Sequence, residues 1–386
     1  MANIQGVDRR KPSHRVPSIE CFIRSGSKLV PLDAASERLA LPGNPPPVTA
    51  PVTYGQYMSS VARLLSENSF MALRKLLKKQ LKPIPKLEAA SNIELIAEKH
   101  GALYSVSRLR IRFADDERSF AVNCAFSPDQ QAFLEVEVRH LANLHARFGL
   151  PYLPLPFISA KGPGLMLSIA EWFENHHEFH LSADASGAPA ITVWTQSEEP
   201  RFLDASKTRE LYAQASKILT LYLDSRSFSQ IYPWHHGAGD FVVDESRIPL
   251  SLRLITIRGY RPLLARKSDC RDKMLGSLHF FVNMGIRMRI DRLDGTGELA
   301  WAGAQCLPGV IRGFVEAWET RGENTHLPKA REILSLFLDF SPHDRLEFAK
   351  IVAADGRVEA DEGSFLLACL PGHVIELSDV MENFKF

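Results

Sequence analysis

The chain has 386 residues, of which 45% are hydrophobic and 24% are charged, and its 46 Lys and Arg residues nearly balance its 45 Asp and Glu residues. This is the composition of a globular protein long enough for two or three domains, and it excludes a miniprotein with one small core. A formal net charge of +1 provides no overall attraction to nucleic acid or to an acidic membrane. We therefore expect a globular protein that has no nucleic-acid partner.

Membrane insertion and disulfide bonding are not expected either. No run of the sequence reaches the roughly 18 apolar residues that a bilayer span requires. The charged stretch Asp8–Lys11 stands where a signal peptide would be apolar. The five cysteines are scattered and never form a C-x-x-C pair, which is typical of a reducing compartment. These features predict a cytoplasmic protein with no membrane span.

The N-terminal part of the chain changes character at about residue 55. Residues 1–55 are rich in proline and predict an extended, partly disordered leader. From Tyr54 to Leu81 apolar residues recur every three or four positions, which predicts one or two helices. The basic stretch Arg74–Lys86 contains no acidic residue. Such a run is typical of a solvated helix face, and the alternative is a surface for an acidic protein partner or a lipid.

The central part predicts strands and the second half predicts helices. Leu103–Phe113 alternates between apolar and polar residues, turns at Asp115–Glu117 and continues into Ser119–Phe126, which predicts a hairpin. Helical spacing follows over Ala132–Arg147. Further strands are expected at Leu153–Ile158, Leu165–Trp172, Ala190–Trp194 and Leu252–Ile257, and further helices at Ala205–Leu223, Met274–Met288, Val310–Glu319 and Ala330–Phe340.

This order of elements predicts an α+β protein with two lobes. The first is a small lobe built on an antiparallel sheet, and the second is larger and mainly helical. We place the strand-rich lobe, with its leading helices, at residues 56–175 and the helical lobe at 176–340. Residues 341–386 are expected to form a helical C-terminal extension.

Four segments carry a resemblance to a known family. They are Phe120–Asn123 followed by a helix with Glu137, the loop I-Y-P-W-H-H-G-A-G-D-F-V-V at Ile231–Val243, the strand Leu254–Arg258 and the helix Ile311–Trp318. Their order resembles the aminoglycoside and choline kinase branch of the protein-kinase-like superfamily, over roughly residues 92–319. The resemblance implies a two-lobed kinase-like fold, a cleft between the lobes for a nucleotide or small metabolite, and ATP and Mg²⁺ as cofactors.

The family's functional positions fall on residues of different chemistry in this chain. The catalytic base of the family falls on His235 and its metal-binding Asn on Asp240. The metal-binding Asp falls on Thr256 and the strand Lys on Asn123. Phosphoryl transfer needs a base for the acceptor and charge neutralisation on the transferred group, so His235 and Asp240 are the candidate catalytic residues and Asp240 the candidate metal ligand.

Four further residues complete the nucleotide site that the resemblance implies. Glu137 keeps the position of the family's helix glutamate, and Asn123 lies where its lysine partner would be. Glu171 and Phe173 bound the predicted hinge, whose backbone groups would contact adenine. Structural roles are the alternatives: a loop histidine hydrogen-bonded to backbone for His235, and an anchor of the Gly-Ala-Gly-Asp turn for Asp240.

Two functions follow from this pattern. One is a divergent ATP-dependent phosphotransferase that uses His235 as the base and acts on a small alcohol or amine. The alternative is a catalytically inactive, pseudokinase-like binding or scaffold protein, because the Lys, the Asp and the Asn of the family have all been replaced. Each lost charge would cost several kcal/mol of transition-state stabilisation.

Three other clusters have both a functional and a structural interpretation. His176–His180 contains three histidines and a glutamate, which suggests either a metal site or a polar hinge. Arg108, Arg110 and Arg112 lie on one side of a strand and could bind an anion or form an exposed face. The stretch Arg287–Asp294 carries three arginines and two aspartates, which predict an internal ion network or an arginine fork for a substrate anion.

Overall fold

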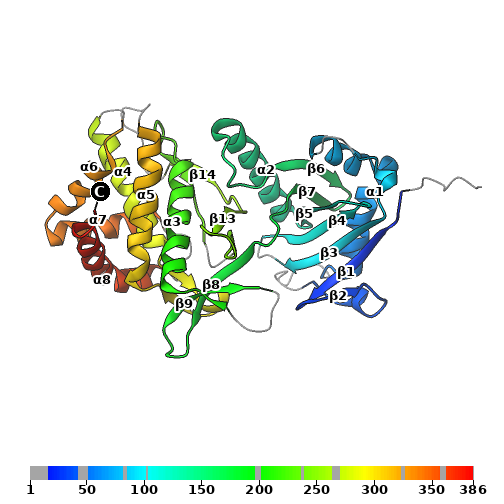
Figure 1. The fold of residues 1–386 in the computed structure, drawn as a ribbon, viewed down its shortest axis with the longest axis horizontal. Helices are drawn as coiled ribbons and strands as arrows, with labels where there is room; N and C mark the ends of the chain where they lie inside the picture. Colours follow the sequence, from blue (N-terminus) through cyan, green and yellow to red (C-terminus); the bar gives the residue numbers. More distant parts are fainter. Residues whose placement is uncertain are drawn as a thin grey trace, which may run out of the picture. The chain divides into compact units, whose positions relative to one another are not determined.

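The computed structural model describes residues 16–41, 51–80, 85–100, 103–195, 201–235, 239–262, 270–322, 327–356 and 362–385. Two compact units make up the chain. The first consists of Met1–Leu134 and Pro156–Trp172, and the second of Glu135–Leu155 and Phe173–Phe386. Both contain helices and strands (Figure 1), so the α+β class predicted from the sequence is confirmed.

A seven-stranded sheet with the order β2-β1-β3-β4-β5-β7-β6 forms the first unit. Every neighbouring pair is antiparallel except β1 and β3, which are parallel. Its strands are β1 (Ile19–Ser25), β2 (Lys28–Pro31), β3 (Asn92–His100), β4 (Ser105–Arg112), β5 (Glu117–Ala125), β6 (Pro156–Gly162) and β7 (Leu165–Glu171). The hairpin predicted from Leu103 to Phe126 is β4 and β5, and α2 (Pro128–Phe148) follows it.

Part of the predicted proline-rich leader is an integral strand of this sheet. Ile19 pairs with Ile93 and Ile23 pairs with Ala97, so β1 lies beside β3 in regular register. Ile19 and Cys21 pack against the same core as the central strands. The expectation of an extended leader is therefore wrong for residues 16–41, because apolar residues at every second position let this stretch join a sheet. Residues 1–15 and 42–50 lie outside the described residues.

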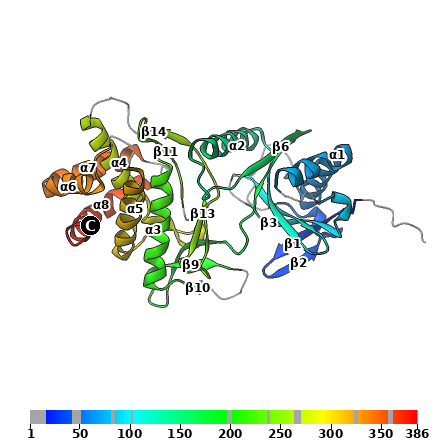
Figure 2. The ribbon, with the colours of Figure 1, turned by 45° about the horizontal axis from the view of Figure 1, so that its top comes forward.

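Helix α1 (Tyr54–Gln80) covers one face of the first sheet (Figure 2). Its buried side chains, such as Val61 and Leu65, pack with Leu109 and Val122 of the strands. Positive φ angles at residues 68–70 interrupt the helix, which matches the expectation of one or two helices. Within the predicted basic stretch, Arg74 forms an ion pair with Glu88 at 2.6 Å, and the Lys79 ammonium donates to the carbonyl oxygen of Phe157 at 2.6 Å.

The second unit contains a five-stranded antiparallel sheet with the order β10-β9-β8-β12-β13. Its strands are β8 (His177–Ala183), β9 (Pro189–Trp194), β10 (Arg201–Phe202), β12 (Phe241–Asp244) and β13 (Ser251–Leu254). Two short ribbons accompany it, formed by β11 (Ser229–Ile231) with β14 (Tyr260–Pro262) and by β15 (Ile290–Arg292) with β16 (Leu299–Trp301).

Helices pack against this sheet and against one another. They are α3 (Ala205–Leu221), α4 (Cys270–Arg287), α5 (Leu307–Gly322), α6 (Ala330–Asp339), α7 (Pro342–Asp355) and α8 (Glu362–Glu382). Figure 1 shows α3 and α5 side by side, and they approach closely because Gly309 and Gly313 of α5 face the backbone of α3. The four helices predicted between Ala205 and Phe340 are thus confirmed as α3 to α6.

The expected C-terminal extension at 341–386 belongs to the body of the second unit. Val352 of α7 and Leu370 and Leu377 of α8 are buried in the same cluster as Phe281 and Phe314. The helices were predicted correctly, but they complete the core and do not extend from it. By length and composition α8 could cross a membrane, a test that a soluble core helix also passes, and 39% of its most apolar stretch is buried.

Candidate functional site

The two described ends of the loop that resembles a kinase catalytic loop are hydrogen-bonded to each other in the second unit. The loop connects β11 to β12, and its described residues are those up to His235 and from Gly239 onward. The His235 amide donates to Oδ2 of Asp240 at 2.8 Å, and the Asp240 amide donates to the carbonyl oxygen of His235 at 3.2 Å. Gly239 has a φ of +71°, and a side chain there would collide with the carboxylate of Glu178 on β8. The two predicted catalytic residues are therefore in direct contact.

Asp240 is paired with an arginine that the sequence did not suggest as its partner. Arg258 Nε lies 2.9 Å from Oδ2, and Arg258 Nη2 lies 3.1 Å from Oδ1. Asp240 has 1% of its side chain exposed and Arg258 has 17%. A bidentate guanidinium–carboxylate pair of this kind is among the strongest hydrogen-bonded contacts in proteins. The carboxylate predicted to bind a metal ion is thus already neutralised by a fixed cation.

Glu137 supports the segment that bears Arg258. This residue lies on α2 with 1% exposure, and its Oε1 accepts a hydrogen bond from the Ile257 amide at 2.8 Å. On the other side of Thr256, the Ile255 amide donates to the carbonyl oxygen of Asp240 at 2.7 Å. The half-buried Thr256 is therefore held between two anchored backbone groups. Glu137 thus positions this segment by accepting a hydrogen bond from the segment's backbone.

His235 contacts a buried ion pair. Arg287 of α4 and Glu362 at the start of α8 each have 1% of the side chain exposed, and Arg287 Nη1 lies 2.6 Å from Glu362 Oε2. Arg287 Nη2 lies 3.1 Å from His235 Nε2. His235 Nε2 also lies 3.7 Å from Glu362 Oε1, so this ring nitrogen faces both members of the ion pair. The nitrogen that a general base would use is therefore in contact with Arg287.

The remaining predicted site residues lie elsewhere in their units. In the first unit, half-buried Asn123 pairs with Ser168 across β5 and β7, and Glu171 pairs with Phe120. In the second unit, the Phe173 ring lies 5.7 Å from the His176 ring and 5.5 Å from the Arg253 guanidinium. Within the second unit the structure therefore brings together His235, Asp240, Glu137 and the Thr256 segment.

From His177 on, the cluster at His176–His180 belongs to strand β8 in the middle of the sheet. His176 Nε2 lies 3.1 Å from the Ser251 hydroxyl, and the His180 ring lies 4.6 Å from the Trp194 ring. Among the described residues, no three His, Cys, Asp or Glu side chains are grouped to hold a metal ion. The histidines of this segment therefore serve packing and hydrogen bonding in the sheet.

The two arginine clusters form internal ion networks. On the first sheet, Arg110 and Arg112 both pair with Glu94, which is 4% exposed. In the second unit, Arg289 pairs with Glu376 of α8 at 2.5 Å and donates to the carbonyl oxygen of Ala302 at 2.7 Å. These contacts favour the structural interpretation of both clusters over anion binding.

Buried residues near Arg289 are kept neutral by their surroundings. His373 of α8 is 1% exposed. Burial, together with the nearby Arg289 charge, lowers the pKa of His373 to about 3. Sequence reasoning missed Glu362, Glu376 and His373 as partners of the arginines. The available signal was the presence of charged residues within otherwise apolar helices. A charged side chain is buried in a protein core only where it has a partner.

No protein-family model matches the sequence, and no curated protein is significantly similar to it.

Proposed function

We propose that this chain is a kinase-like protein whose catalytic loop is locked by structural ion pairs, and that it acts as a binding or scaffold protein without phosphotransfer. The ion pair between Asp240 and Arg258 is the observation that carries this proposal. Arg258 occupies Asp240, the one acidic residue in the loop sequence Ile231–Val243 and hence its one candidate carboxylate ligand for a divalent cation.

The kinase-like part of the proposal is supported by the order of elements. A strand bearing Asn123 (β5) precedes a helix bearing Glu137 (α2), and the β6–β7 hairpin follows. In the second unit the loop at His235–Asp240 contacts the segment at Ile255–Arg258, as a catalytic loop and a metal-binding segment would. This is the sequence of parts that the family resemblance implies.

Loss of phosphotransfer is supported by the contacts that Asp240 and His235 make with arginines. Phosphoryl transfer requires cations at the transferred group and a free base at the acceptor hydroxyl. A metal ion at Asp240 would have to displace a bidentate guanidinium from a buried carboxylate, which leaves a desolvated cation behind. A substrate proton at His235 Nε2 would have to displace Arg287.

A divergent ATP-dependent phosphotransferase is the second candidate. The observation that favours it is the 13% exposure of the His235 side chain, next to the Asp240 carboxylate. In such an enzyme His235 would deprotonate a small alcohol or amine, while Mg²⁺ and ATP would require Asp240 to leave Arg258.

A thermal-shift experiment with ATP and Mg²⁺, ATP alone and Mg²⁺ alone separates the two candidates. A ligand that binds only the folded state raises the melting temperature. We expect Mg²⁺ alone to have no effect, and any stabilisation by ATP to be the same with and without Mg²⁺. Stabilisation that requires both ATP and Mg²⁺, together with phosphate release that is lost in Asp240→Asn, would establish the enzyme instead.

A further inference from the structure

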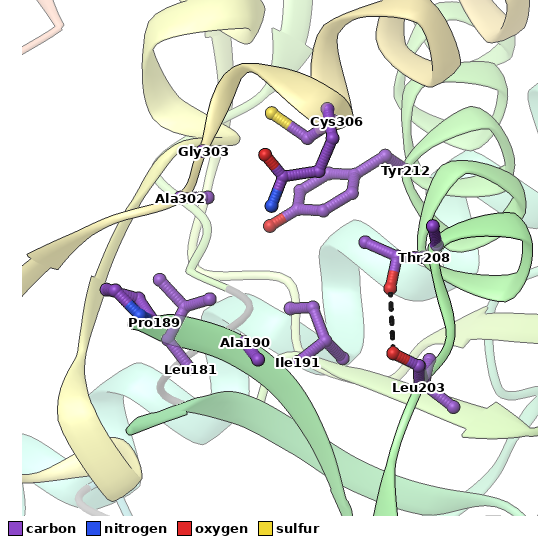
Figure 3. A pocket seen from close by; sticks show the side chains of 12 residues that line it. Leu181, Pro189, Ala190, Ile191, Leu203, Thr208, Tyr212, Ala302, Gly303 and Cys306 are labelled. Carbon is purple, nitrogen blue, oxygen red and sulfur yellow. Dashed lines mark hydrogen bonds between the residues drawn. The ribbon is translucent and has the colours of Figure 1, made fainter. Parts of the chain in front are cut away.

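The second unit exposes large apolar side chains on its last two helices. Among the described residues, five such side chains are more than half exposed, and three of these lie on α7 and α8: Ile351 (59%), Leu367 (52%) and Ile375 (63%). The hollow between β8, β9 and α3 differs, because it is open to solvent and is lined by polar and apolar groups alike (Figure 3). Exposed apolar residues that lie together are typical of a contact site, which points to α8.

The exposed side of α8 is apolar along its middle. Its exposed residues recur at helical spacing and form one stripe: Ser364, Leu367, Ala368, Pro371, Gly372, Ile375, Asp379 and Glu382. We call the part from Leu367 to Ile375 the α8 apolar face, since its members have no charged or hydrogen-bonding side chain. Large side chains stand at the two ends of this face, and small residues lie between them. A Cβ atom added at Gly372 would have no neighbour within 4 Å, so the middle of the face is open.

A lipid bilayer does not fit this face. Helix α8 is long and apolar enough to cross a membrane, but Glu362 pairs with Arg287 at 2.6 Å and Glu376 pairs with Arg289 at 2.5 Å. Moving α8 into lipid would leave two buried arginines without their acidic partners. At the surface, the exposed Asp379 next to the α8 apolar face repels anionic headgroups. The occupant is therefore a protein surface that is itself apolar.

A second copy of α8 in the antiparallel direction complements this face. If the two helices cross between Pro371 and Gly372, the partner's Ile375 lies against Ala368, so a large side chain meets a small one. The exposed Asp379 near the C-terminal end then lies beside the partner's first turn, whose N–H groups carry a partial positive charge. A parallel copy would place the two acidic ends together. Charge complementarity thus selects the antiparallel copy.

We propose that two copies of this chain associate through their α8 apolar faces, antiparallel, about a two-fold axis near Gly372. The two-fold axis repeats every contact, so both ends of the pair are satisfied in the same way. The exposed face of one helix buries less than the roughly 1,200 Å² of a stable complex, and we therefore expect a weak dimer with a dissociation constant of about 100 µM. This inference does not depend on the kinase-like interpretation.

Sedimentation equilibrium of the full chain, from about 1 µM to about 1 mM, measures this association. Ile375→Glu puts a charge on the α8 apolar face and should raise the dissociation constant at least tenfold. Ile248→Glu is the matched control, because Ile248 is fully exposed in the second unit but lies outside the face, and it should change nothing. A wild type that is monomeric at about 1 mM, or equal effects of the two variants, would overturn the proposal.

Disulfide crosslinking tests the direction of the pair, in a Cys369→Ser background because Cys369 is a half-buried free thiol of α8. Gly372→Cys should yield a crosslinked dimer, since this position lies at the two-fold axis. Glu382→Cys should not, because ten residues of helix separate it from the axis and its two copies lie roughly 30 Å apart. Equal crosslinking at both positions would indicate a parallel pair and contradict the proposal. Co-sedimentation with phosphatidylcholine vesicles that Ile375→Glu abolishes would assign the face to a bilayer instead.

Discussion

Replacing Arg287 with methionine should lower the free energy of unfolding of the second unit by about 3–5 kcal/mol, measured by urea denaturation. The variant leaves the Glu362 carboxylate buried at 1% exposure without its cation, and it removes the donor to His235 Nε2. The desolvation penalty of an unpaired buried charge is the reason for the large effect.

Two comparisons isolate the ion pair from the loss of the side chain. Lys350→Met, also in the second unit, breaks the exposed pair with Glu347, whose side chains are 40% and 48% exposed, and should cost less than about 1 kcal/mol. The double variant Arg287→Met/Glu362→Leu removes both charges and should be more stable than Arg287→Met alone. If the double variant were the less stable of the two, or if Arg287→Met were as mild as Lys350→Met, Arg287 would not be neutralising a buried charge.

Introducing a single methyl group at Gly313 should destabilise the second unit by about 3 kcal/mol or more. The Cβ atom of Gly313→Ala would overlap the carbonyl oxygen of Ala213, and this neighbour is helix backbone that cannot rotate away. Helices α3 and α5 would have to separate along their shared contact. This expected loss of stability is opposite in sign to the change in helix propensity, because alanine is favoured over glycine in helices by about 1 kcal/mol.

Gly372→Ala in α8 is the matched control for this substitution. A Cβ atom at Gly372 would have no neighbour within 4 Å. This variant should therefore be neutral or more stable by up to about 1 kcal/mol. Equal stability changes at Gly313 and Gly372 would show that the close approach of α3 and α5 contributes nothing specific.

Local patterns in the sequence predict the local parts of the fold. The β4–β5 hairpin was predicted because apolar residues alternate on both sides of the Asp115–Glu117 turn, and helices α3 to α6 because their apolar residues recur at helical spacing. Strand β1 was missed because neighbouring prolines dominated the composition of its segment. Its partner β3 lies more than 70 residues away in the chain, and periodicity says nothing about such pairing.

The same limit explains what was missed at the candidate site. The His235–Asp240 turn is only a few residues long and could be predicted as a unit. Its partners come from distant elements: Glu137 contacts Ile257 across 120 positions, and Arg287 contacts Glu362 across 75. Sequence reasoning therefore singled out His235 and Asp240 but not the arginines that contact them.

The role of Arg258 decides between the two proposed functions. A guanidinium is positively charged at every accessible pH. Arg258 therefore neutralises the Asp240 carboxylate without a bound metal ion. We therefore expect the contact between Asp240 and Arg258 to persist whether or not a metal ion is present. A catalytic loop needs a carboxylate that stays available and is neutralised only when the metal–nucleotide complex binds.

A double-mutant cycle on Asp240 and Arg258 tests this account most directly. The free energies of unfolding of the wild type, Asp240→Asn, Arg258→Met and the double variant would be measured with and without Mg²⁺. The account predicts a coupling energy of about 2–4 kcal/mol that Mg²⁺ does not change. A coupling energy near zero, or one that collapses when Mg²⁺ stabilises the wild type, would show that Asp240 is available to a metal ion.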